Sequence, residues 1–210
     1  MKEPAGPGGR APRVAAIALV VQALLQRADA SATGLSMTTH AAIYLAIAAL
    51  GVAVLASLSM IALRVRSRWA IAGLLVWAVA WVAITMDLCA LIRWSLGGPV
   101  PPGPQALRHL DAEIVQILAT VGGLLIGGVL VTSIRDVRVR HSAVVLLTGY
   151  AVFGLIATVT EHRIDLATDF PHITALRKDR DLADAITSFA LAGVLWLSGR
   201  QAADRRHRAW

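Results

Sequence analysis

Cysteine is almost absent from this chain, which has one such residue, Cys89, in 210. A disulfide framework needs pairs of cysteines and a Cys/His zinc site needs several, so both are excluded. The motifs HExxH, GxSxG, GxxxxGKS/T and GxGxxG are also missing, which removes support for zincins, serine hydrolases, P-loop proteins and dinucleotide-binding enzymes. Cys89 fits a small apolar side chain better than a nucleophile, because no basic group lies beside it in sequence.

Charge is scarce as well. Only 16% of the residues are charged, whereas 57% are hydrophobic and the mean hydropathy is +0.66. A soluble domain of this length does not need that much apolar surface for its core. The composition therefore predicts a protein whose solvent is largely a lipid bilayer.

The apolar residues are gathered in helix-length stretches separated by short polar turns. A stretch of about 20 apolar residues is long enough to cross the hydrocarbon core of a bilayer as a helix. The fold class predicted is all-α, a polytopic transmembrane helix bundle within residues 14–199, between a disordered cytoplasmic tail, 1–13, and a basic cytoplasmic tail, 200–210. The six predicted spans are 14–30, 41–63, 70–92, 114–134, 143–160 and 182–198.

The first span has an alternative interpretation. Its apolar run, 14–25, is short, and Ala28-Asp29-Ala30 resembles the small-residue cleavage site of a secretory signal. Cleavage would leave five spans. We favour an uncleaved span because Gln26 and Arg27 interrupt the usual approach to such a site.

The basic residues predict the orientation of the bundle. With the amino terminus inside, 13 of the 20 Lys and Arg residues lie in cytoplasmic segments, whereas nine of the 13 acidic residues lie outside. This positive-inside bias predicts both termini in the cytoplasm and a multi-pass protein of the plasma (inner) membrane. The bias also explains the net charge of +7 without nucleic acid, which we exclude as a partner. The abundance of Ala, Val and Arg, with few Lys, is typical of a bacterial genome rich in G and C.

Small residues recur at four-residue intervals in several spans. Ala119, Gly123 and Gly127 share one face of the fourth span, and Asp184, Ser188 and Ala192 share one face of the last. Lipid tails are as apolar as leucine, so membrane helices associate through close backbone approach and polar contacts. We expect the fourth span to be central in the bundle. Such spacing is also common by chance in a chain rich in Ala and Gly.

The most polar stretch runs from Glu161 to Asp184 between the last two spans, and we expect it to be an extracytoplasmic loop. If the fifth helix continues past the membrane, Glu161, Asp165 and Asp169 fall on one helical face. Imidazole and carboxylate groups together suit a divalent transition metal such as zinc, iron, copper or manganese. The predicted ligands are His162, Asp165, Asp169, His172 and His109.

A simpler interpretation explains the same residues without a metal. Pro171 clashes with a continuing helix, so the fifth helix is expected to stop near Thr168 and a new one to start. Thr168 or Asp169 would then cap the new helix, with Pro171 in its first turn. The other polar side chains of the stretch would simply be solvated.

Asp87 is an acidic residue within the predicted span 70–92. A carboxylate in a membrane is costly and usually has a function or a partner. Asp87 could therefore have one of three roles: part of a proton or ion relay, a metal ligand, or one half of an ion pair that fixes the helix register. Expected partners at the same depth are His40, His109, His162, Arg163 and Arg93.

Two functions fit these features. The first is a membrane-embedded subunit or small transporter-like protein with a polar extracytoplasmic surface, in contact with the lipid bilayer and with membrane-protein partners or further copies of itself. The second is a metal-dependent hydrolase or oxidase that acts on a lipid or another hydrophobic substrate at the outer leaflet. The sequence does not decide whether the protein is an enzyme, and it resembles no family by a motif that can be matched residue by residue.

Overall fold

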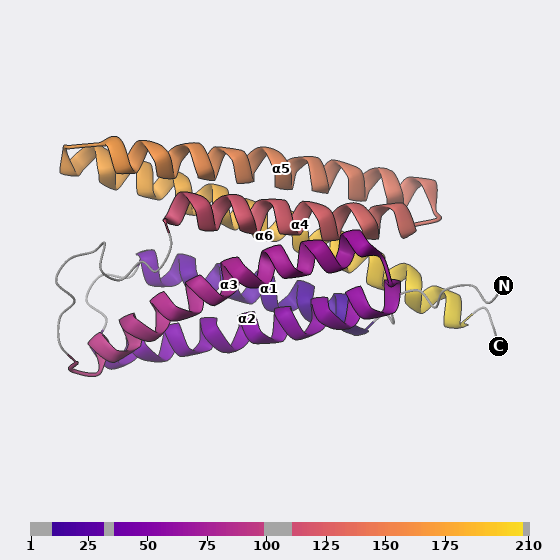
Figure 1. Ribbon diagram of the computed structural model, residues 1–210, viewed down its shortest axis with the longest axis horizontal. Coiled ribbons are helices and arrows are strands. Elements are labelled where there is room, and N and C mark those ends of the chain that lie inside the picture. The colour runs from indigo at the N-terminus through magenta and orange to yellow at the C-terminus, as the bar shows by residue number, and fades with distance from the viewer. Residues whose placement is uncertain (1–9, 32–35, 99–110, 208–210) are drawn as a thin grey trace.

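The computed structural model describes residues 10–31, 36–98 and 111–207, and every regular element in these ranges is an α-helix. Consecutive helices run antiparallel along the long axis of the molecule, so that α1 begins and α6 ends at the same end of the bundle (Figure 1). The helices are α1 (Arg10–Ser31), α2 (Met37–Val65), α3 (Arg68–Ser95), α4 (Ala112–Ser133), α5 (Val137–Leu166) and α6 (Phe170–His207).

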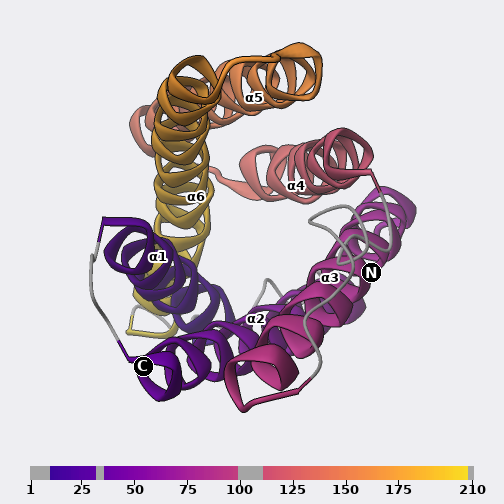
Figure 2. The same cartoon turned by 90° about the vertical axis from the view of Figure 1, so that its left-hand side faces the viewer.

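The helices form a ring in chain order. Each helix packs against the next, α6 closes the ring against α1, and α4 and α6 also touch each other. The view along the bundle shows this order directly (Figure 2). Helices that follow one another in a chain usually pack side by side, because short connections keep them together.

Polar side chains mark where the helices begin and end. Ser36 accepts a hydrogen bond from the backbone N–H of Thr39 at 3.2 Å. Asp136 accepts from the backbone N–H groups of the first turn of α5, at 2.9 and 3.1 Å. At the carboxyl end of α2, Arg66 adopts the left-handed conformation with φ 51°, so that the chain reverses within two residues. This tight hairpin agrees with the short gap between the predicted spans 41–63 and 70–92.

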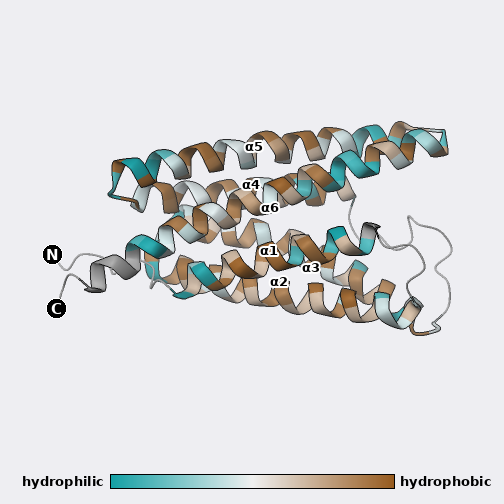
Figure 3. Ribbon diagram, turned by 180° about the vertical axis from the view of Figure 1, so that it is seen from behind, coloured by the Kyte–Doolittle hydropathy of each residue, from teal (hydrophilic) through white to brown (hydrophobic). Residues whose placement is uncertain are grey.

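Six helices are long and apolar enough to cross a membrane. Large apolar side chains also cover the outside of the bundle, and Leu63 and Val145 are 71% and 70% exposed. In Figure 3 the hydrophobic residues occupy the middle of the helices, and hydrophilic residues concentrate toward the ends. These features are those of a multi-pass membrane protein, as the composition predicted.

Close helix contacts depend on glycine at two neighbouring positions of α4. A side chain on Gly122 would meet the backbone oxygen of Gly73 in α3 at 2.8 Å, and one on Gly123 would meet Tyr150 of α5. The Tyr150 hydroxyl donates a hydrogen bond to the backbone oxygen of Ala119, at 2.8 Å. The predicted small-residue face of the fourth span is therefore a contact surface for α5.

The centre of the bundle differs from the expectation. α4 does touch three helices, but so does α6, and half of the apolar stretch of α6 is buried, the largest share of any helix described. The centre is thus shared between α4 and α6, because α6 closes the ring and also lies against α4.

The polar stretch between the last two spans is not an extended loop. α5 continues to Leu166 and α6 begins at Phe170, so the stretch is the end of a helical hairpin with a turn of three residues, 167–169. Asp169 caps α6, because its carboxylate accepts from the backbone N–H of His172 at 3.1 Å. The predicted stop before Pro171 and the predicted cap are confirmed.

The helices at both chain ends are longer than the predicted spans. α1 starts at Arg10 and includes Pro12, which is tolerated in the first turn of a helix. α6 continues to His207, so most of the predicted basic tail is helical. Residues 1–9 of the predicted amino-terminal tail lie outside the described residues. α1 packs along α2 and α6.

Candidate functional site

The α5–α6 hairpin buries a charged residue. Glu161 lies on the inward face of α5, in line with Ala157 and Ile164, and only 2% of its side chain is exposed. A buried carboxylate needs a compensating charge and hydrogen bonds. In this hairpin α6 supplies both.

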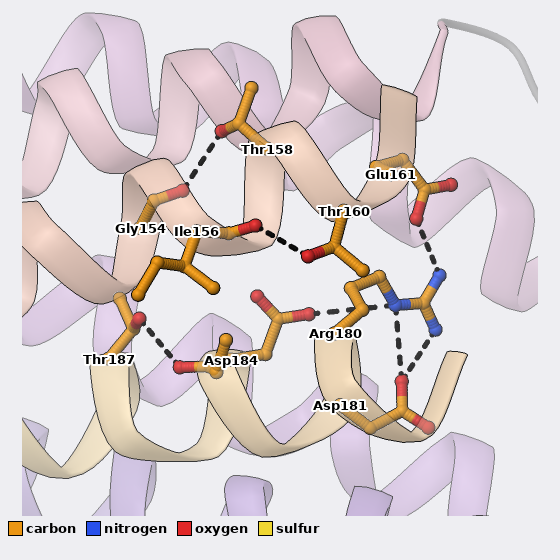
Figure 4. Close-up of polar contacts among 10 residues, drawn as sticks. Gly154, Ile156, Thr158, Thr160, Glu161, Arg180, Asp181, Asp184 and Thr187 are labelled. Carbon is orange, nitrogen blue, oxygen red and sulfur yellow. Dashed lines mark hydrogen bonds and ion pairs between the residues drawn. The ribbon is translucent and has the colours of Figure 1, made fainter. Parts of the chain in front are cut away.

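Arg180 of α6 is the centre of the charged cluster (Figure 4). Its Nη1 donates to Glu161 at 2.9 Å, and its Nη2 and Nε donate to one carboxylate oxygen of Asp181 at 2.6 and 3.1 Å. A third carboxylate, that of Asp184, lies one helical turn further along α6, with 3.9 Å between its oxygen and Nε. Since the guanidinium is planar and rigid, contacts on several sides fix its position between the two helices.

The charges of this cluster do not balance. Three carboxylates, those of Glu161, Asp181 and Asp184, surround the single guanidinium of Arg180. The whole chain carries +7, so this acidic excess is local. Asp184 is the most distant of the three from the guanidinium and 35% of its side chain is exposed, so its charge is the least compensated by Arg180.

A polar cleft opens beside the cluster, between α1, α2, α3 and α6. Its volume is about 350 Å³. Arg180, Asp181 and Asp184 form its wall on α6, and Arg27 and Asp29 form its wall on α1. Apolar and uncharged side chains complete the lining: Ala23, Gln26, Tyr44, Ile47, Leu88, Leu91 and Ala185.

A second polar contact lies at the α1 side of this cleft. The Nδ1 atom of His40 is 2.7 Å from the carboxylate of Asp29, so that α2 and α1 are joined at their neighbouring ends. Tyr44 stacks on the His40 ring at 6.1 Å between ring centroids and also lines the cleft. Ionisable groups from α1, α2 and α6 therefore converge on one volume.

Four of the five predicted metal ligands lie at the turn end of the α5–α6 hairpin. His162 contacts Glu113 of α4 at 3.1 Å, and Asp169 serves as the cap of α6. Asp165 is exposed near the end of α5, and His172 is exposed in the first turn of α6. In the described ranges, no group of three or more His, Cys, Asp or Glu side chains is arranged to hold a metal ion. His109 lies outside the described residues, so the metal site stays a prediction.

The predicted common face of Glu161, Asp165 and Asp169 is not formed. The helix ends at Leu166, three residues before Asp169, and Glu161 is buried whereas Asp165 is exposed. Pro171 accounts for the break, because its ring cannot follow an uninterrupted helix.

Asp87 lies in α3 and is partly buried, as expected for a carboxylate within a span. Two of its predicted partners contact other carboxylates: His40 contacts Asp29 and His162 contacts Glu113. Cys89, two residues further along α3, is exposed on the outside of the bundle.

The sequence analysis missed the pairing of Arg180 with Glu161, although a signal was present. Buried residues of α6 recur at intervals of seven, four and three positions, at Leu176, Ala183, Thr187 and Ala190, and so share one helical face. Arg180 and Asp184 fall on this same stripe. Extending the spacing of the apolar residues in span 182–198 toward the amino end of the helix would have placed both residues on the face that packs against the bundle.

No model of a protein family matches this chain, and neither does any curated protein or any solved structure. The function is therefore argued from the geometry of the cleft.

Proposed function

We propose that this chain is a multi-pass protein of the plasma membrane, a membrane-embedded subunit or small transporter-like protein, that binds a small cationic solute in the polar cleft. The observation that supports the proposal is the local excess of acid around the cleft. The cleft is lined by two arginines and three aspartates, namely Arg27, Arg180, Asp29, Asp181 and Asp184, and the buried Glu161 contacts Arg180. Ionisable groups within membrane-spanning helices commonly mark ion or solute sites.

Asp184 is the residue expected to meet the solute. Arg180 is held mainly by Glu161 and Asp181, whose oxygens lie at 2.9 and 2.6 Å, whereas Asp184 lies at 3.9 Å. An amine or alkylammonium group between Asp184 and Asp29 would offset the excess negative charge. The half-apolar lining, with Ile47, Leu88 and Leu91, suits the carbon skeleton of such a solute.

The test is thermal stabilisation of the detergent-purified protein by methylammonium, choline and putrescine, with glutamate and sulfate as anionic comparisons. A ligand at about one hundred times its Kd is expected to raise the Tm by roughly 5 °C. Asp184→Asn should remove this shift, because it deletes the least compensated carboxylate. Asp179→Asn is the matched control, since Asp179 is an exposed acid on the same helix outside the cleft lining.

Either of two results would contradict the proposal. One is a protein stabilised by none of the cations, or equally by the anions. The other is an Asp184→Asn variant that responds to the cation as the wild type does.

A further inference from the structure

A second cavity lies on the outside of the bundle, between α1, α5 and α6. It is a groove of about 530 Å³, and no charged side chain is among its lining residues in the described part of the chain. Ile17 and Val21 form one side and Phe189, Gly193 and Trp196 form the other. The larger side chains are partly exposed, with Ile17 at 55% and Trp196 at 44%. In a bilayer this groove faces the acyl chains.

The groove has arginines at one end only. On α1, Arg13 precedes the lining residues Ala16 and Ile17 by three and four positions, so it continues the same helical face. On α6, Arg200 follows Trp196 by four positions and is exposed. Because α1 and α6 are antiparallel neighbours (Figure 2), both arginines lie at the end of the bundle that holds the chain termini.

Arg13 is held beside the groove by its contact with a lining tryptophan. The carbon at the centre of its guanidinium lies 5.5 Å from the centroid of the Trp196 ring, in a cation–π contact. Its Nε is buried and has no hydrogen-bond acceptor among the described residues. A phosphate oxygen is an acceptor that guanidinium groups bind well.

We propose that this groove binds an anionic phospholipid, with an acyl chain along α1 and α6 and the phosphate between Arg13 and Arg200. An apolar channel with positive charge at a single end matches the chemistry of such a lipid, whose charge is also at one end. A basic site between membrane helices on the cytoplasmic side is a known way for proteins to select anionic headgroups. The lipid would belong to the leaflet on the side of the two termini.

A comparison groove makes the proposal specific. The cavity of about 570 Å³ between α3 and α4 lies at the same end of the bundle and includes an exposed tryptophan, Trp69, with the guanidinium carbon of Arg68 at 5.5 Å from its ring centroid. Arg68 is exposed, whereas Arg13 is half-buried and its Nε has no acceptor among the described residues. Because an exposed arginine is more fully solvated and screened, this groove should select the headgroup less strongly. Gly128 lines it and has open space beside it, so a side chain can be added there.

The experiment is native mass spectrometry of the delipidated full chain, titrated with phosphatidylglycerol or with phosphatidylcholine of the same acyl chains. We expect tighter binding of phosphatidylglycerol by the wild type. Removing each arginine, as Arg13→Ala or Arg200→Ala, should weaken that binding roughly fivefold. Val21→Trp, which fills the groove at an exposed position, should abolish the selective site.

Two controls separate the groove from general surface charge. Arg64→Ala with Arg140→Ala removes two exposed arginines from the same end of the bundle, away from the groove lining. Gly128→Phe fills the comparison groove instead. Both should leave the preference for phosphatidylglycerol unchanged.

The proposal is overturned if phosphatidylglycerol binds no better than phosphatidylcholine, or if the control arginines matter as much as Arg13 and Arg200. It is also overturned if the same spectra show a dimer that Val21→Trp dissociates, because a second copy of the chain would then occupy the groove. Should the arginine variants fail to fold, Val21→Trp and Gly128→Phe still decide between the outcomes.

Discussion

At the end of the bundle that holds both termini, the arginines of the turns, among them Arg64, Arg138 and Arg140, are exposed. At the opposite end, Arg180 is enclosed between α5 and α6 and contacts the buried Glu161. The difference shows that arginine has two roles in this protein. We expect the exposed arginines to orient the chain in the membrane, whereas Arg180 joins two helices and lines a cleft.

The largest expected effect concerns the sidedness of these two ends. In a Cys89→Ser background, a cysteine introduced at His172 should react with a membrane-impermeant thiol reagent added to intact cells, because the charged end is expected outside. A cysteine at Arg140 should react only after the cells are permeabilised. Both positions are exposed and lie at opposite ends of the bundle. Labelling of both from the same side would remove the distinction between the ends.

Next in size is the loss of the enclosed arginine. Arg180→Met leaves Glu161 buried without its main compensating charge, which should cost about 3–5 kcal/mol of unfolding free energy. Arg138→Met, at the opposite end, should change stability by no more than about 0.5 kcal/mol. Unfolding in mixed detergent micelles measures both. Combining Arg180→Met with Glu161→Gln should restore part of the loss, and equal effects of the two single arginine variants would contradict the comparison.

In the middle of the bundle, replacing a glycine of α4 by alanine should change stability by an amount that depends on its position. Gly122→Ala places a methyl group against the backbone oxygen of Gly73, where the ideal separation is 2.8 Å, and should cost about 1–3 kcal/mol. Gly128→Ala is the matched control, since nothing lies within 4 Å of the added carbon. It should be neutral or stabilise the helix by up to about 1 kcal/mol. The same unfolding assay applies, and a similar loss at both positions would show that α3 and α4 do not approach each other at Gly122.

The smallest effect is expected for the polar contact between α4 and α5. Tyr150→Phe removes the hydrogen bond to the backbone oxygen of Ala119, at 2.8 Å, and keeps the ring in place. The expected loss is about 0.5–1.5 kcal/mol. A loss as large as that of Arg180→Met would mean that the middle of the bundle, and not its charged end, joins the helices most strongly.

The success and failure of the sequence analysis have a common physical cause. The spans, the tight turn after α2 and the cap at Asp169 depend on residues close in sequence, and all were predicted. The pairing of Arg180 with Glu161 spans 19 residues and depends on how α5 and α6 face each other. A loop of solvated charges and a helical hairpin with an internal ion pair have the same composition, so composition could not distinguish them.

The same limit applies to the cleft and to the groove. Arg27 and Asp29 are far from Asp184 in sequence, and they share a cleft because α6 returns to lie beside α1. Arg13 and Trp196 meet for the same reason. Nothing in the local sequence of α1 indicates which distant helix will be its neighbour.

The amino-acid sequence by itself determined that this chain forms apolar helices, which parts of the chain they contain, and that most of its basic residues and most of its acids lie at different ends. These properties follow from the hydrophobicity, capping and charge of neighbouring residues. Only the tertiary structure decided that α6 closes a ring, that Arg180 is enclosed, and that two cavities of different chemistry form. Their formation requires contacts between helices at opposite ends of the chain, and such contacts depend on the packing of the whole bundle.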